Sequence, residues 1–319
     1  MPAVAASACA KLILLGEHAV VYGEPALAIP FSGLRARAAV EAWIGAPSGR
    51  IHIFARDLDL DEDWSSLPEN NLIRNALGLV LYELGIERLP TCKLNLSTEI
   101  PISAGLGASA ALAVAVMRAF SAFLGHPLDT ERLNALAYKS ETLMHGTPSG
   151  IDNTVVVYEQ PIVFAKSQGF ELIHALNDVH FLIADSGVKK ATALTVSQLA
   201  QDYAQNPGKI GAIIHDIGQL SMEGVYALTR GDLPALGEAL NANQELLALL
   251  DLSCPELDLL ISTARAAGAI GAKLTGGGKG GHMLALVRSE QLDQVREAML
   301  RAGAPHVYHT VLRQERSDA

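Results

Sequence analysis

The sequence has few cysteines, few aromatic residues and a shortage of positive charge, and each of these limits what the protein can be. Its 319 residues include three cysteines, Cys9, Cys92 and Cys254, with no metal-type spacing and no paired framework, so a reduced, cytoplasmic setting is expected. Aromatic residues make up 5% of a chain that is 50% apolar, so we expect a core of Ala, Leu, Val and Ile. The net charge of −10 argues against a general nucleic-acid-binding protein, which would need a basic surface.

The sequence also lacks a secretory signal and a membrane-spanning segment. The N-terminus has no charged start followed by an apolar core, and the apolar run at residues 12–15 follows Lys11 and stops at Gly16. The most apolar segment, residues 104–124, contains Ser109, Arg118 and Ser121, which favours a buried helix over a membrane span. We therefore expect neither a membrane nor a nucleic acid as a partner.

Hydrophobic periodicity predicts a protein with both helices and strands. Strands are expected at residues 8–15, 27–29, 34–43, 51–60, 93–98, 154–158, 161–164, 181–184 and 306–312, with a strand, glycine loop and strand at 272–287. Helices are expected at residues 70–84, 108–124, 130–145, 190–204, 208–228, 232–249, 255–267 and 290–302. The acidic run after residue 60 reads as a solvated loop, and the weakly patterned residues 166–178 are the candidate domain boundary.

The most informative stretch is the small-residue loop PISAGLGASAA at residues 101–111, which leads directly into an apolar helix. Small residues let backbone N–H groups approach a ligand, and a helix N-terminus favours anions, so the stretch predicts a phosphate site. The P-loop pattern is absent, because no Gly-Lys-Ser/Thr occurs here. The dinucleotide fingerprint matches at Gly105, Gly107 and Ala110, but a loop stands about 20 positions on, where that fingerprint needs an acidic residue. We interpret the stretch as a different phosphate loop.

Two charged residues lie in apolar patterns where charge is costly. Lys11 is part of an apolar strand, so it either faces a phosphate or a catalytic carboxylate, or reaches solvent at the strand end. Glu141 shares the apolar face of the helix at 130–145 with Leu133 and Ala137, so it is either a magnesium ligand or half of a buried salt bridge.

Three further features suit phosphate chemistry, and each has a purely structural alternative. Ser109 stands at the start of the apolar helix, where it can either bind Mg²⁺ or cap the helix. Asp152 lies in a glycine-rich turn expected to enter a strand, where an aspartate can be a general base or a turn former. Residues 276–281 contain five glycines, which can form a second backbone cradle for phosphate or a sharp turn.

Together these motifs resemble the signatures of the GHMP small-molecule kinases, which include galactokinase, homoserine kinase, mevalonate kinase and phosphomevalonate kinase. The three family signatures occur in order at residues 11–23, 101–111 and 273–281. Within the family, KLILLGEHAVVYG at 11–23 and HGTPSGIDN at 145–153 are most similar to the mevalonate kinases. The resemblance covers nearly the full length of the chain.

The resemblance implies a two-domain α+β fold and a kinase activity. Residues 1–174 would form an N-terminal ATP-binding domain like ribosomal protein S5 domain 2, and residues 175–319 a ferredoxin-like C-terminal domain. The implied reaction is transfer of the γ-phosphoryl of ATP to the C5 hydroxyl of mevalonate with the help of Mg²⁺. Relatives in the family are often homodimers, so a homodimer is compatible with the resemblance.

The resemblance also implies roles for individual residues. Asp152 would accept the proton of the substrate hydroxyl, and Lys11 would pair with Asp152 and the transferring phosphate. Mg²⁺ would be held by Ser109 and Glu141. The residues expected near mevalonate are Glu17, His18 and Thr192. The residues expected to bind ATP are Pro101, Ile102, Ser103, Ala104, Gly105, Leu106, Gly107, Ala108, Ser109, Ala110, Ala111, Gly276, Gly277 and Gly278.

The chain departs from the family pattern at three positions. Ala108 replaces the first serine of Gly-Leu-Gly-Ser-Ser, which removes one hydroxyl contact to ATP, and Ser103 replaces a glycine. Lys279 replaces a small residue and faces either phosphate or solvent. The alternatives to mevalonate as acceptor are those of a mevalonate 3-kinase, a phosphomevalonate kinase or a sugar kinase. A non-catalytic ligand sensor on this fold and a dinucleotide-dependent oxidoreductase are the more distant alternatives.

Overall fold

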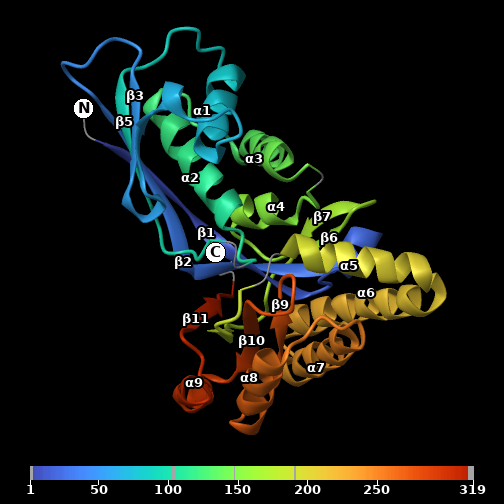
Figure 1. The fold of residues 1–319 in the computed structure, drawn as a ribbon. Coiled ribbons are helices and arrows are strands. Elements are labelled where there is room, and N and C mark those ends of the chain that lie inside the picture. Colours follow the sequence, from blue (N-terminus) through green and yellow to red (C-terminus); the bar gives the residue numbers. More distant parts are fainter. Residues whose placement is uncertain (1–2, 103–104, 147, 190–191, 315–319) are drawn as a thin grey trace. The chain divides into compact units, whose positions relative to one another are not determined.

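The computed structural model describes residues 3–102, 105–146, 148–189 and 192–314, which fall into two compact units (Figure 1). The first unit comprises Met1–Ala10, Leu34–Ile102 and Gly107–Glu159, and the second comprises Lys11–Gly33, Ser103–Leu106 and Gln160–Ala319. The strands β1 and β2 each continue from one unit into the other. The two units are interleaved along the chain rather than sequential. The domain boundary expected between residues 174 and 175 stays a prediction.

The elements follow the expected order of strands and helices closely. The strands are β1 (Val4–Leu15), β2 (Ala26–Ala42), β3 (Ile51–Ala55), β4 (Leu60–Asp63), β5 (Cys92–Thr98), β6 (Ile162–Ala165), β7 (Gly169–Leu172), β8 (Val179–Asp185), β9 (Gly271–Thr275), β10 (His282–Val287) and β11 (Val307–Leu312). The α-helices are α1 (Leu72–Glu83), α2 (Ala108–Phe123), α3 (Thr130–His145), α4 (Ile151–Tyr158), α5 (Thr192–Gln205), α6 (Pro207–Arg230), α7 (Leu233–Leu249), α8 (Pro255–Ala266) and α9 (Leu292–Arg301). Short 3-10 helices lie at Ala19–Tyr22 (η1), Arg56–Leu58 (η2), Trp64–Ser66 (η3) and Ser289–Gln291 (η4).

The first unit packs α1 and α2 against one face of the strands β4, β3, β5 and β2, and α3 packs against α1 and α2 (Figure 1). β2 and β5 are antiparallel, with Ala38 opposite Leu96, and β3 runs parallel to β5. Alternate residues of these strands are buried, as expected for a sheet with one covered face. α2 is buried almost all round between residues 110 and 121, because its Ala and Val side chains let the neighbouring helices approach closely.

The second unit contains an antiparallel sheet in the order β11-β8-β10-β9. Its core gathers apolar side chains from these strands and from α5, α6, α7, α8 and α9. The first residues of β2 pair with β6, which pairs with β7, and these strands also belong to the second unit.

The edge strand β9 is covered by side chains of α7 rather than by another strand. Asn241 Oδ1 accepts a hydrogen bond from the Ala272 N–H at 3.0 Å, and Gln244 Oε1 accepts one from the Leu274 N–H at 2.9 Å. Two amides therefore occupy backbone donors that would otherwise be unpaired at the sheet edge. This fixes the strand that leads into the third signature.

The structure corrects three expectations of local structure. Residues 154–158 lie in the helix α4 rather than a strand, because Gly150 begins the helix with φ 95° and a short apolar run does not distinguish a buried helix from a buried strand. The strands expected at 27–29 and 34–43 are one strand, β2. The acidic run after residue 60 belongs to β4 and pairs with β3.

Candidate functional site

The first glycine loop enters α2 through two glycines in the left-handed region. Gly105 has φ 74°, and Gly107, at the N-cap of α2, has φ 75°. L-residues rarely adopt this conformation, so glycine is required for the chain to turn here into the helix. Ser103 and Ala104, which were expected to bind ATP, lie outside the described residues.

Ser109 and Glu141 meet within the first unit. The Ser109 hydroxyl, in the first turn of α2, donates a hydrogen bond of 2.9 Å to Glu141 Oε1 on α3. Glu141 is 4% exposed, and α2 and α3 pack together. The two expected magnesium ligands therefore bring a hydroxyl and a carboxylate oxygen to one place, which is the donor set that Mg²⁺ prefers.

Asp152 lies in the first turn of α4 and is partly exposed. A carboxylate at this end of a helix is stabilised by the unpaired backbone N–H groups and the helix dipole. The next residues fix the helix from inside the unit: Thr154 Oγ1 donates to the Gly150 carbonyl at 2.7 Å, and the amide groups of Asn153 and Asn134 approach to 2.7 Å. The candidate base thus lies on a helix rather than on the glycine-rich turn that the sequence predicted.

Lys11, residues 105–106 of the first glycine loop and the whole second glycine loop belong to the second unit. Lys11 is 4% exposed on β1, and its N–H donates a hydrogen bond of 3.0 Å to the Leu106 carbonyl in the first loop. The loops approach backbone to backbone, because a Cβ built on Gly105 would lie 3.6 Å from the Gly276 Cα. Residues 105 and 276, far apart in sequence, therefore contribute to one glycine-lined surface.

Glu17 forms a buried ion pair with Lys273 on β9. Glu17 is 1% exposed and Lys273 0% exposed, and the Lys273 Nζ also donates to the Leu274 carbonyl at 2.6 Å. Burial raises the pKa of the Glu17 carboxyl and lowers the pKa of the Lys273 amine, while the pairing opposes both shifts. The carboxylate of Glu17 is turned into the second unit, so the structure gives it a partner within the protein.

His18 is held neutral beside the third signature. Its Nε2 lies 3.1 Å from the Gly277 carbonyl oxygen, and burial lowers the pKa of the imidazole to about 4. Because a carbonyl can only accept, Nε2 carries the proton in this arrangement. His18 also has φ 62°, which is unusual for a residue with a Cβ and marks a constrained turn.

For some of the expected site residues, the structure does not describe the side chain or does not test the expected contact. Lys11 belongs to the second unit and Asp152 to the first, so their pairing stays a prediction. Thr192 is the first residue of α5, and its side chain lies outside the described residues. Lys279, whose role the sequence left open, pairs with Asp251 at 2.5 Å.

The sequence analysis missed two groups of residues. Lys273 gave the same signal as Lys11, a lysine between apolar strand residues, but its place in the third signature drew attention to the glycines instead. The ion network of Arg35, Arg118 and Glu159 gave no signal, because its members stand far apart in sequence.

The described residues offer neither a membrane-spanning helix nor a cluster of metal-ligating side chains. None of the described helices is both long enough and apolar enough to cross a bilayer. Among the same residues, no group of three or more His, Cys, Asp and Glu side chains could hold a metal ion.

Comparison with known proteins points to one family. The chain matches the GHMP kinases N terminal domain over residues 71–160 and the GHMP kinases C terminal domain over residues 225–305. The Mevalonate kinase of Pyrococcus furiosus is 32% identical over 95% of this chain and 95% of the relative. The Mevalonate kinase of Pyrococcus horikoshii is 34% identical over 95% of this chain and 94% of the relative.

Solved structures give the same result at the level of the fold. The Methanococcus jannaschii mevalonate kinase superposes with a TM-score of 0.85 at 26% identity, covering 99% of both chains. The L. major mevalonate kinase, solved in complex with R-mevalonate, superposes with a TM-score of 0.82 at 28% identity, covering 99% of this chain and 97% of that one. The two-domain α+β architecture expected from the sequence is therefore confirmed.

Proposed function

We propose that this chain, which belongs to the GHMP kinase family, is an ATP-dependent mevalonate kinase that phosphorylates the C5 hydroxyl of mevalonate. The observation that carries the proposal is the likeness, along nearly the whole chain, to proteins named mevalonate kinase. The residues in which chemistry would reside are all present: Lys11, Ser109, Glu141 and Asp152.

The glycine loops would bind the phosphates of ATP. Backbone N–H groups of residues 105–110 and of 276–278 are the donors we assign to this role, because glycine and alanine leave them open to a ligand. The approach of Gly105 to Gly276 supports a shared surface. Without a side chain at these positions, an anion can reach the backbone closely.

Ser109 and Glu141 would hold Mg²⁺. Their oxygens lie 2.9 Å apart, and Glu141 is almost fully buried, which suits a hard cation that takes oxygen ligands. When bound, the cation offsets negative charge on the nucleotide phosphates.

Asp152 would accept the proton of the attacking hydroxyl, and Lys11 would stabilise negative charge on the transferring group. Phosphoryl transfer depends mainly on positioning and electrostatic stabilisation, so a carboxylate on a rigid helix and a buried lysine suit it. His18 would meet the acceptor as a neutral imidazole, because its pKa lies well below neutrality. Glu17 directly precedes His18, and its ion pair with Lys273 would hold this part of the chain in place.

A coupled ADP-release assay over a panel of alcohols tests the proposal. We expect turnover with mevalonate and MgATP, with the phosphate on C5 when the product is examined by ³¹P and ¹³C NMR. Galactose, homoserine and mevalonate 5-phosphate should give no more than background. A preference for any of these three, or phosphate on C3, would replace mevalonate 5-phosphorylation with the activity of another family member.

Two broader features remain proposals of the same kind. A cytoplasmic location is supported by three cysteines that form no disulfide. A homodimer is compatible with the family, and light scattering of the purified protein would establish its oligomeric state.

A further inference from the structure

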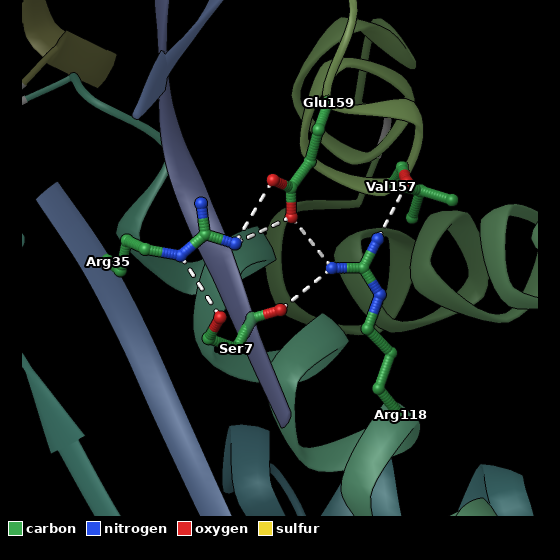
Figure 2. A network of polar contacts seen from close by, with 5 residues as sticks. All are labelled: Ser7, Arg35, Arg118, Val157 and Glu159. Carbon is green, nitrogen blue, oxygen red and sulfur yellow. Dashed lines mark hydrogen bonds and ion pairs between the residues drawn. The ribbon is translucent and has the colours of Figure 1, made fainter. Parts of the chain in front are cut away.

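Three charged side chains join β1, β2, α2 and α4 within the first unit (Figure 2). The Glu159 carboxylate accepts hydrogen bonds from Arg35 at 2.9 and 3.0 Å and from Arg118 at 2.8 Å. Arg35 Nε also donates to the Ser7 hydroxyl on β1 at 3.0 Å. One carboxylate thus bridges an arginine of β2 and an arginine of α2.

Arg118 makes the network a clamp rather than a simple ion pair. Its Nη1 donates to the Ser7 carbonyl and its Nη2 to the Val157 carbonyl, both at 2.7 Å. The planar guanidinium therefore holds the backbone of β1 and the last turn of α4 at a fixed separation. We call the group formed by Arg35, Arg118 and Glu159 the arginine clamp.

The backbone at Glu159 supports this reading. Glu159 ends α4 with φ 51°, a left-handed conformation that is unfavourable for a residue with a Cβ. Glycine or asparagine would adopt it more easily, yet the chain has the residue whose carboxylate completes the clamp. The side-chain interaction therefore compensates for a strained helix end.

Three of the four elements in the clamp, β1, α2 and α4, lead to a residue assigned to the chemistry. β1 runs on from Ser7 to Lys11, α2 has Ser109 in its first turn, and α4 has Asp152 in its first turn. α4 is only eight residues long, so a tilt at its C-terminal end moves Asp152 directly. The clamp therefore contacts the two helices that carry Ser109 and Asp152, and the strand that continues along the chain to Lys11.

We propose that the arginine clamp is a positioning device for the phosphoryl-transfer residues, with Glu159 as its central positioning residue. The inference rests on the proposed function for its kinetic consequence. Glu159 touches neither substrate nor nucleotide in this scheme; it acts through α4 on the placement of Asp152. A displacement of about 1 Å at a reacting group can cost about 100-fold in rate, so a remote clamp can matter.

The first test is the isosteric variant Glu159→Gln. It leaves the two guanidinium groups without their shared anion while changing almost no volume. We expect kcat to fall by about 10- to 100-fold, with KM for ATP and for mevalonate within about twofold of the wild type. The matched control is Glu99→Gln, which removes the carboxylate of an exposed pair with Arg37 in the same unit and should leave kcat unchanged.

A double-mutant cycle separates positioning from general loss of stability. If Glu159 acts through Asp152, Glu159→Gln should lower the residual kcat of Asp152→Asn by about twofold or less. An equal fold-loss in both backgrounds, or a wild-type kcat for Glu159→Gln, overturns the proposal. Should Glu159→Gln fail to fold, Arg118→Lys is measured the same way, since it keeps the charge and removes the planar fork.

Hydrogen exchange distinguishes failure of the clamp from failure of the proposed function. Amides of α4 should exchange faster in Glu159→Gln than in the wild type, and those of α6 should not change. An enzyme that does not phosphorylate mevalonate but shows this exchange pattern retains the clamp and loses the proposed reaction. Unchanged exchange in α4 with an active wild type overturns the clamp alone.

Discussion

The Ser109 hydroxyl donates its hydrogen bond to Glu141, so two residues from different helices form one oxygen-rich pair inside the first unit. The serine is fixed by the start of α2, and the glutamate by the apolar face of α3. A hydroxyl and a carboxylate oxygen are the kinds of ligand that Mg²⁺ prefers. The pair is therefore suited to a cation.

Glu141→Gln should weaken the response to magnesium more than the affinity for mevalonate. The substitution keeps the shape of the side chain but removes the charge that attracts the cation. We expect the Mg²⁺ concentration for half-maximal rate to rise by about 10-fold or more, the scale of losing a supporting group at a metal site. Glu131→Gln, an exposed change on the same helix, is the control, and an unchanged Mg²⁺ response in Glu141→Gln would remove this residue from the cation site.

Asp152→Asn should abolish most turnover and leave nucleotide binding intact. Asparagine fits the first turn of α4 but does not accept the proton of the attacking hydroxyl. We expect kcat to fall by about 10²- to 10⁴-fold, the usual contribution of a positioned acid–base group. ATP affinity, measured by calorimetry, should change by less than about threefold. Asp216→Asn on the exposed face of α6 serves as control, and near-normal turnover in Asp152→Asn would refute the assigned role.

The sequence predicted most helices and the central strands because their patterns are long. α2 and α3 begin and end within a residue of the expected positions, since capping residues and glycines mark their ends. Residues 154–158 of α4 were predicted as a strand because a short apolar run does not show the periodicity that distinguishes a helix.

The site was predictable where a residue broke its local pattern, and not where tertiary contacts alone reveal it. Glu141 stood out as a carboxylate on an apolar face, and the structure pairs it with Ser109. Glu17 was expected near substrate, but nothing in the sequence indicated that its carboxylate is turned toward Lys273. Arg118 entered only as a polar residue in an apolar segment, because a clamp made by distant residues leaves no local pattern.

Lys273→Met should destabilise the protein strongly, because it leaves Glu17 buried without its cation. Both side chains are almost completely inaccessible to solvent, so water cannot replace the lost partner. We expect the free energy of unfolding to fall by about 3–5 kcal/mol in urea denaturation. Lys273→Met combined with Glu17→Gln should recover part of that loss, because no unpaired charge remains.

The exposed pair of Arg301 and Glu297 provides the comparison for Lys273. Arg301→Met should change the free energy of unfolding by less than about 1 kcal/mol, because solvent screens both charges. Equal effects of Lys273→Met and Arg301→Met would contradict the importance of the buried pair.

His18 should make the protein less stable as the pH falls below about 6.5. Burial lowers the pKa of His18 to about 4 in the folded chain, whereas an unfolded histidine titrates near 6.5. Between these values the unfolded state binds a proton that the folded state does not, so stability is present above pH 6.5 and is lost progressively toward pH 4. Between pH 7.5 and pH 5, His18 alone should lower the free energy of unfolding by about 2 kcal/mol. Urea denaturation of the wild type and of His18→Gln at both pH values isolates the contribution of His18 to the free energy of unfolding, because the two proteins share all other titrating groups. The wild type should lose about 2 kcal/mol more than the variant, and equal losses in the two proteins would show that His18 is not held neutral by the fold.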